Sequence, residues 1–205
     1  MLLPDGEPRM VSQVPCALAR EEAQVRAVEE AEVRIREAAA QARAVCRDVV
    51  VGDLEAPATR EDVRRAVGDG GVDVVLCADV LEHLRDPWDT LAWLRTLLAP
   101  GGRAVISVPN VAHWTARREL LRGRFPYAQH GLFDRTHLRF FTRESARELA
   151  HRAGFAVRRE APAPAPLPLE SRVPALARVR DPCVRRCPEL LALQFVLVLS
   201  PQGRP

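Results

Sequence analysis

The sequence predicts an α/β fold built on a mainly parallel sheet. Three observations predict it: a continuous apolar run at residues 72–77, a second strand that ends at Val108-Pro109-Asn110, and an amphipathic helix between them. Continuous rather than alternating hydrophobicity is typical of a strand that helices cover on both faces. Parallel strands joined through a helix bind ligands beyond their carboxyl ends. We therefore expect a site where Ala78-Asp79 and Pro109-Asn110 meet.

The elements before and within this unit follow from local composition. Residues 17–45 are rich in strong helix formers and free of proline, so they predict one long helix. Residues 48–52 predict a strand. Asp86-Pro87 supplies an N-cap and a proline at the first helical position, and Pro100-Gly101-Gly102 is expected to end that helix.

The rest of the chain predicts a helix, two strands and a linker. A cap-like Thr142-Arg-Glu-Ser145 begins a helix that runs to Ala153, and strands are expected at 155–160 and 190–199. Residues 161–168 alternate proline with small or apolar residues, which predicts a semi-rigid connector. Residues 173–186 form a short helix or a loop. We expect a helical N-terminal segment, 1–45, followed by one α/β domain, 46–205.

Composition bounds the functional classes. The chain has 205 residues, is 47% hydrophobic and 28% charged, and has no apolar stretch near the ~18 residues of a membrane span. We expect a cytoplasmic protein that binds neither membrane nor nucleic acid, because the net charge is only +3 and the arginines are spread along the chain. Cys183-x-x-x-Cys187 lacks a second ligand pair, so unpaired thiols are expected there.

Several motifs in order resemble one enzyme family. The segments 73–84, 98–110 and 138–142 closely resemble the class I S-adenosylmethionine-dependent methyltransferases, and the closest subgroup has Leu-Glu-His after its fourth strand, as at 81–83. The resemblance covers roughly residues 44–160 and continues weakly into the last strand. It implies a Rossmann-like, doubly wound fold and S-adenosylmethionine as cofactor. It also implies methyl transfer to oxygen, nitrogen or carbon of a small-molecule or saccharide-type acceptor.

The family's first strand and Gly-x-Gly loop are missing from this sequence. No glycine lies between Gly6 and Gly52, and Glu32 is the nearest carboxylate to the expected ribose-binding position. We therefore expect an incomplete sheet, in which residues 48–52 either pair with 72–77 or are poorly supported. Three interpretations stay open: a truncated or frameshifted N-terminus, a catalytically silent domain that docks a protein partner through its N-terminal helix, or an enzyme with an unrecognised loop.

The resemblance assigns four cofactor-binding residues. Asp53 accepts a hydrogen bond from the adenine amino group and Leu54 packs on the ring, while Ala78 and Asp79 line the cleft beneath the cofactor. From the residues alone, Asp53 is equally well explained as a turn or cap, and Asp79 as the N-cap of the next helix.

Candidate catalytic residues follow Asp79 directly. On a helix, Asp79, Glu82 and His83 share one face, where they could hold a hard divalent cation or place a general base. We name Glu82 and His83 as the candidate bases and expect no metal, because most relatives of this fold use none. A base is optional in methyl transfer, since the sulfonium donor is already activated.

An acceptor pocket is expected after the strand that ends at Asn110. Its candidate residues are Asn110, His113, Tyr127 and His130. The stretch 125–141 is dense in aromatic residues for this chain and is a candidate lid. Core packing is the expected fate of three of its rings, Phe133, Phe140 and Phe141.

Overall fold

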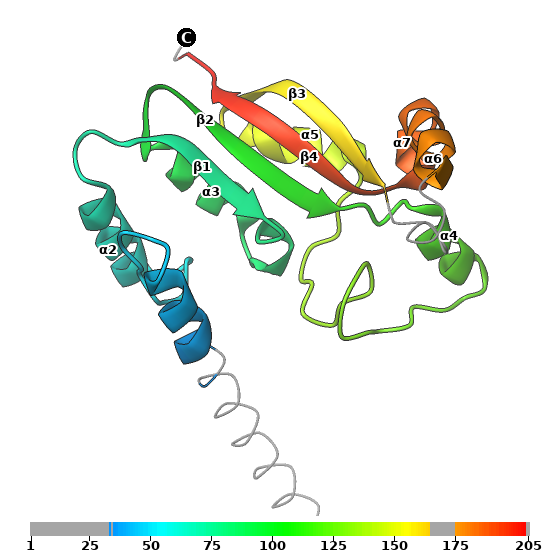
Figure 1. The fold of residues 1–205 in the computed structure, drawn as a ribbon, viewed down its shortest axis with the longest axis horizontal. Helices are drawn as coiled ribbons and strands as arrows, with labels where there is room; N and C mark the ends of the chain where they lie inside the picture. The colour runs from blue at the N-terminus through cyan, green and yellow to red at the C-terminus, as the bar shows by residue number, and fades with distance from the viewer. Residues whose placement is uncertain (1–32, 34, 165–174, 204–205) are drawn as a thin grey trace, which may run out of the picture. The chain divides into compact units, whose positions relative to one another are not determined.

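The computed structural model describes residue 33, residues 35–164 and residues 175–203 (Figure 1). Contacts divide the chain into two units, Met1–Gly52 and Asp53–Pro205, and each is described by itself. In the first unit, residues 35–43 form a helix that ends in a turn at residues 44–45. This confirms the end of the predicted 17–45 helix. Its earlier part lies outside the described residues.

The second unit is built on a four-stranded sheet with the order β1-β2-β4-β3 (Figure 1). Strand β1 spans Val72–Ala78 and pairs in parallel with β2, Leu98–Pro109. Strand β4, Ala192–Pro201, runs antiparallel to β2 and to β3, Phe155–Pro164. The predicted α/β, Rossmann-like class is confirmed. The described sheet nevertheless has one parallel and two antiparallel pairings, whereas we expected mainly parallel ones.

The prediction of a strand at residues 48–52 is wrong. These residues have neither helix nor strand geometry, and no described strand pairs with the free edge of β1. A strand is stable only when a neighbour pairs with its backbone groups. Among the described residues, no strand supplies such a neighbour to residues 48–52. The outcome is the second of the two that we expected: residues 48–52 are left without support.

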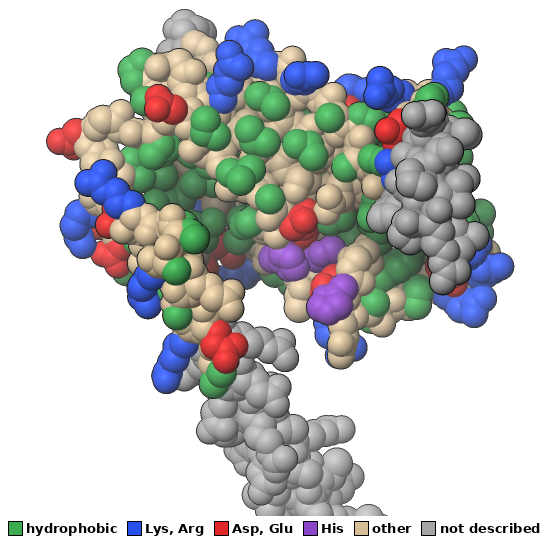
Figure 2. Space-filling view, in the orientation of Figure 1, with side chains coloured by type: hydrophobic (Ala, Val, Ile, Leu, Met, Phe, Trp, Pro, Cys, Tyr) green, Lys and Arg blue, Asp and Glu red, His purple; other side chains and the backbone are tan. Residues whose placement is uncertain are grey.

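Only one face of β1 is covered by described residues. Val75 and Cys77 are buried, whereas Val74 is 59% and Leu76 is 69% exposed. The sequence predicted cover on both faces. In the space-filling view, hydrophobic side chains gather over the sheet (Figure 2). Only one face of this apolar run is therefore buried against other residues of the described chain.

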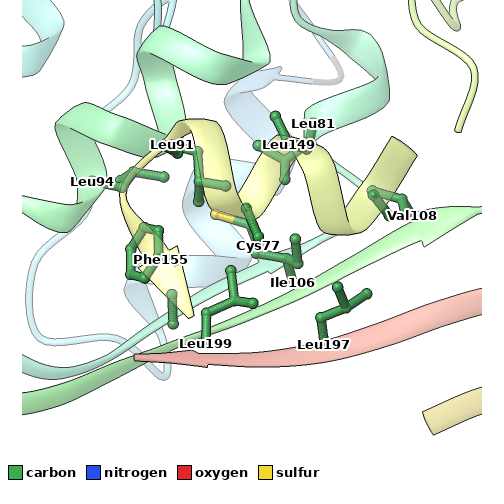
Figure 3. Packing of buried hydrophobic residues seen from close by; sticks show 14 of the residues in the cluster. Cys77, Leu81, Leu91, Leu94, Ile106, Val108, Leu149, Phe155, Leu197 and Leu199 are labelled. Atoms are coloured by element: carbon green, nitrogen blue, oxygen red, sulfur yellow. The ribbon is translucent and has the colours of Figure 1, made fainter. Parts of the chain in front are cut away.

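The core lies between the sheet and two helices, α3 (Pro87–Arg95) and α5 (Arg143–Arg152). Figure 3 shows Leu91 of α3 and Leu149 of α5 directed toward side chains of the strands. All of the strands contribute to this layer. The largest side chains in it that are almost wholly buried are Leu81, Leu91, Ile106, Val108, Leu149, Phe155, Phe195, Leu197 and Leu199.

Both predicted helix starts are confirmed. The Asp86 side chain accepts the Asp89 N–H at 2.9 Å, and the Thr142 side chain forms a capping box with Ser145. The predicted helix stop is misplaced, because α3 already ends at Arg95. Residues 100–102 instead lie inside β2, where the pairing with β1 shifts register between Val72 and Val74.

The remaining elements are short. They are α2 (Pro57–Val67), a 3₁₀ turn η1 (Leu81–His83), α4 (Trp114–Leu121), α6 (Ala175–Arg186) and α7 (Pro188–Leu191). Strand β3 runs to Pro164, so the first four residues of the predicted connector 161–168 belong to the sheet and the others lie outside the described residues. No helix in the described part of the chain is long and apolar enough to span a membrane.

Replacing Leu91 by alanine is expected to lower the free energy of unfolding by about 2–5 kcal/mol, because its side chain is fully buried between α3 and the sheet. Leu121→Ala is the matched control: its side chain is 89% exposed, so the change should stay within about 0.5 kcal/mol. Urea denaturation of both variants measures the difference. Equal losses would contradict the position of the core.

Gly71→Ala is expected to be more destabilising than Gly68→Ala by about 1–3 kcal/mol. Both glycines have positive φ, +68° and +72°, so both substitutions strain the backbone. A Cβ at Gly71 would also lie 2.8 Å from the Ala99 backbone nitrogen, whereas a Cβ at Gly68 meets nothing within 4 Å. The two unfolding free energies, measured in urea, isolate this contact. Equal values would refute the close approach of β1 and β2.

Candidate functional site

A pocket of about 200 Å³ lies where β1 and β2 end and β4 begins. Ala78 of β1 pairs with Ser107 of β2, so the two strands end on the same edge of the sheet, as the sequence predicts. The third wall comes from the connecting segment, which we define as residues 122–142 between α4 and α5. Seven of its eleven lining residues have polar or ionisable side chains: Asp79, Glu82, His83, His130, Asp134, His137 and Gln194.

Asp79 joins the ends of three strands. Its backbone N–H donates to the Ser107 hydroxyl at 3.1 Å, and its Oδ1 accepts from the Ser107 hydroxyl at 3.0 Å and from the Gln194 amide at 2.9 Å. Its φ of +53° is the left-handed conformation, which no other non-glycine residue in the described chain adopts. Such backbone strain in a residue that lines a pocket is a feature of functional sites. It also turns the chain sharply from β1 into η1.

Glu82 is the buried carboxylate of the pocket. The residue is 1% exposed, and neither carboxylate oxygen has a hydrogen-bond partner among the described residues. Burial raises the pKa of this carboxyl group, and the negative charge of Asp79 raises it further. Its backbone carbonyl accepts the N–H groups of Leu138 and Arg139, at 2.8 and 3.0 Å, which fixes the connecting segment against η1.

Two histidines face each other beside Glu82. The rings of His83 and His137 lie 4.9 Å apart in an edge-to-face arrangement. Burial lowers the pKa of His137, and the neighbouring His83 lowers it further. Side chains of the connecting segment support them: Thr136 lies against His83 and donates its hydroxyl to Asp134 at 2.7 Å. Hydrogen bonds from Thr136 lower the pKa of Asp134, so this carboxyl group is ionised at neutral pH.

Glu82, His83 and His137 offer three ligand atoms that all lie within 4.8 Å of one another. The sequence predicted that Asp79, Glu82 and His83 would share one face of a helix. Instead, Leu81–His83 is a single 3₁₀ turn, and Asp79 precedes it in a left-handed conformation. The residue brought next to Glu82 and His83 is His137, which comes from a distant part of the sequence.

The predicted cofactor residues occupy two places. Ala78 and Asp79 are exposed at the end of β1. Asp53 and Leu54 lie in the turn before α2, where Asp53 accepts the Glu55 N–H at 2.9 Å and pairs with Arg85 at 3.4 Å. This is the turn geometry that the residues alone made equally plausible. Leu54 is partly buried against the core.

Of the four predicted acceptor residues, one lines the pocket. His130 belongs to the lining, and Tyr127 is 68% exposed outside it. Asn110 is fully buried and donates its side-chain amide to the backbone carbonyls of Glu189 and Ala192, and His113 is a buried cap of α4. These two side chains hold elements together.

The rings of the connecting segment also differ from expectation. Phe141 joins the core, as predicted, but Phe140 is 41% exposed. Phe125 contacts Phe133, Phe140 and Tyr127 with ring centroids 5.0–5.5 Å apart, so these rings form a small cluster of their own. The cluster stiffens the wall that carries His130 and His137.

Sequence reasoning missed two residues of the pocket. His137 follows Asp134-Arg-Thr in a stretch from which we took Tyr127 and His130 as acceptor candidates and the phenylalanines as core, but not His137. Gln194 is the one polar residue in the apolar run 190–199, and this was a usable signal. A lone polar side chain in a buried strand needs a partner, and the partner is Asp79.

A family model described as a methyltransferase domain matches residues 17–160. The ubiquinone biosynthesis O-methyltransferase of Caulobacter sp. (strain K31) is 44% identical over 54 residues, which are 26% of this chain and 21% of that protein. The match thus spans about a fifth of the length of that curated relative.

Two solved structures are similar in fold. One is a chain of the complex between the Haloferax volcanii Trm112 methyltransferase activator and a methyltransferase, with 18% identity, coverage of 80% of this chain and 68% of that chain, and a TM-score of 0.48. The other is a SAM dependent methyltransferase from Archaeoglobus fulgidus, with 18% identity, coverage of 75% and 69%, and a TM-score of 0.42. Because the family model matches well over half of its residues, this chain belongs to the class I S-adenosylmethionine-dependent methyltransferases.

Proposed function

We propose that this chain transfers a methyl group from S-adenosylmethionine to a hydroxyl group of a small molecule that enters the strand-end pocket. The observation that carries the proposal is the position of the pocket. It lies beyond the carboxyl ends of β1 and β2, the parallel pair of the sheet, which is where α/β folds of this type bind their ligands. Membership of the methyltransferase family supplies the reaction class.

The size and lining of the pocket support a small, polar acceptor. Its volume of about 200 Å³ is below the roughly 300–1,000 Å³ of sites that enclose drug-sized ligands, so it suits a single ring or sugar unit. Glu82, His83 and His130 can hydrogen-bond a hydroxyl group. The Caulobacter relative is an O-methyltransferase, which also favours oxygen as the acceptor atom. Phenols and saccharides both offer a hydroxyl group of this kind.

Some of the described residues suit the adenosine end of S-adenosylmethionine. We propose that Asp79 and Ala78, both exposed at the end of β1, and the turn that carries Asp53 and Leu54 hold this end. A carboxylate such as Asp79 is an acceptor only, which suits ribose hydroxyl or adenine amino donors. No Gly-x-Gly loop follows a strand in the described residues, so they offer no backbone cradle for the methionine end.

Methyl transfer needs little side-chain chemistry. When bound, S-adenosylmethionine supplies a methyl group that is already activated on a sulfonium sulfur. The protein's task is to orient the acceptor and to receive the proton that its hydroxyl group loses. Glu82 suits this task, because burial raises the pKa of its carboxyl group toward that of an effective base. We propose that His83 orients the hydroxyl beside it.

Asp79→Asn is expected to weaken binding of S-adenosylhomocysteine by about 10- to 100-fold, the range for loss of a charged hydrogen-bond acceptor. Asparagine tolerates the left-handed backbone, so the substitution removes the charge and spares the fold. Asp73→Asn, on the exposed part of the same strand, is the control and should bind like the original chain. Isothermal titration measures all three. Absence of binding by the original chain at millimolar ligand would refute the enzyme proposal and favour the silent-domain interpretation.

Glu82→Gln is expected to reduce methyl transfer by about 10²- to 10⁴-fold without changing affinity for S-adenosylhomocysteine, because a base is removed and the shape is kept. The assay follows labelled methyl groups from S-adenosylmethionine into a panel of small phenols, saccharides and amines. Glu61→Gln, in the exposed surface of α2, is the control. Transfer to amines alone would refute the choice of acceptor atom.

A further inference from the structure

We propose that Glu82, His83 and His137 form a binding site for a first-row divalent transition-metal ion such as Zn²⁺. The three side chains come from two segments, η1 and the connecting segment, and their ligand atoms lie within 4.8 Å of one another. This revises the expectation from sequence that no metal is bound. The site does not depend on methyl transfer, since binding of an ion requires neither cofactor nor acceptor.

The first argument is the unsatisfied carboxylate. Glu82 is 1% exposed and neither of its carboxylate oxygens has a hydrogen-bond partner among the described residues. A buried acidic group is stable only when it is neutralised, paired or bound to a metal. No arginine of the described residues forms an ion pair with it, although the chain carries many. A cation bound in the pocket would give the Glu82 carboxylate the partner that the described residues do not provide.

The second argument is the orientation of the two imidazoles. Nδ1 of His83 lies 3.2 Å from the carbonyl oxygen of Thr136. A carbonyl only accepts, so this bond requires the tautomer with the proton on Nδ1, which leaves the lone pair of Nε2 free. The ring of His137 lies opposite that of His83, with ring centroids 4.9 Å apart in an edge-to-face arrangement. A ring nitrogen bonded to a backbone carbonyl is the usual support of a metal-binding histidine, because it fixes both the tautomer and the ring.

The third argument is that the backbone already holds the ligands together. The Glu82 carbonyl accepts the N–H groups of Leu138 and Arg139, directly after His137, and this clamps the second histidine opposite the first. Ligand atoms around a tetrahedral zinc ion lie about 3.4 Å apart, given metal–ligand distances near 2.0–2.1 Å. The ligand atoms, now within 4.8 Å of one another, would have to move closer by side-chain rotation to reach this spacing.

The ligand set selects the kind of ion. Two imidazoles and a carboxylate suit zinc and its first-row neighbours, whereas Mg²⁺ and Ca²⁺ prefer oxygen ligands alone. Three protein ligands leave a position for water or for an oxygen atom of the acceptor. Asp79 and Asp134 add negative charge to the same pocket. A bound ion would occupy the lone pairs of Glu82 and His83, so the proton-accepting role proposed above applies to the metal-free protein.

The test is a titration of the chelator-treated, full-length chain with ZnCl₂, followed by calorimetry, and with CoCl₂, followed by visible absorption. We expect one saturable site. His137→Ala and Glu82→Gln should each weaken the binding of Zn²⁺ by more than about 100-fold, since even loss of a supporting partner costs 10- to 100-fold. His151→Ala, an exposed histidine on α5, is the matched control and should change nothing. Circular dichroism establishes that each variant is folded.

Exposed cysteines need separate treatment, because Cys46, Cys183 and Cys187 are also zinc ligands in principle. All titrations are therefore made on a variant in which these three and Cys16, which lies outside the described residues, are changed to serine. The cobalt spectrum of the original histidine site should show tetrahedral or five-coordinate bands without thiolate charge transfer. Absence of saturable binding, or full affinity in folded His137→Ala and Glu82→Gln, would overturn the proposal. A folding failure of one variant leaves the other variant and the cobalt spectrum to decide.

Discussion

The parallel pairing of β1 with β2 is the constraint on which the site depends. It brings Ala78 beside Ser107, so Asp79 emerges where the Ser107 hydroxyl and the Gln194 amide can both reach it. Those two bonds hold a left-handed backbone that an aspartate would otherwise avoid. The turn at Asp79 then directs Leu81 into the core and Glu82 beneath the pocket. A slip in the pairing would move all of these groups together.

The connecting segment has a second role besides linking α4 to α5. Its backbone binds the carbonyl of Glu82, and Arg139 extends this contact through the carbonyl of Arg85 and the ring of Trp88. The segment therefore carries its own histidine to a fixed place beside η1 and is not a free lid. Because three aromatic rings pack around Phe125, its shape is stabilised independently of any ligand.

The sequence predicted those features that local chemistry decides. Asp86 and Thr142 cap helices because their side chains reach backbone groups within three residues, and β1 is a strand because its residues are mostly β-branched or apolar. Predictions failed where the deciding partner is distant. Residues 48–52 resemble a strand in composition, but pairing decides whether a strand forms. His137 lies 54 residues beyond His83, as their numbers show, and the bonds of the connecting segment to Glu82 and His83 make them neighbours. Asn110 was misjudged for the same reason, since its amide binds carbonyls about eighty residues away.

The outer edge of β1 is the part of the second unit that no described strand completes. Val74 and Leu76 are exposed on one face of this strand, and no described strand pairs with its outer backbone groups. The pocket depends neither on the exposed face of β1 nor on its outer backbone groups, because it is built mainly from η1, the connecting segment and the start of β4. The pocket and the exposed face of β1 therefore rest on different contacts within the second unit, and the pocket keeps its shape without a described strand at that edge.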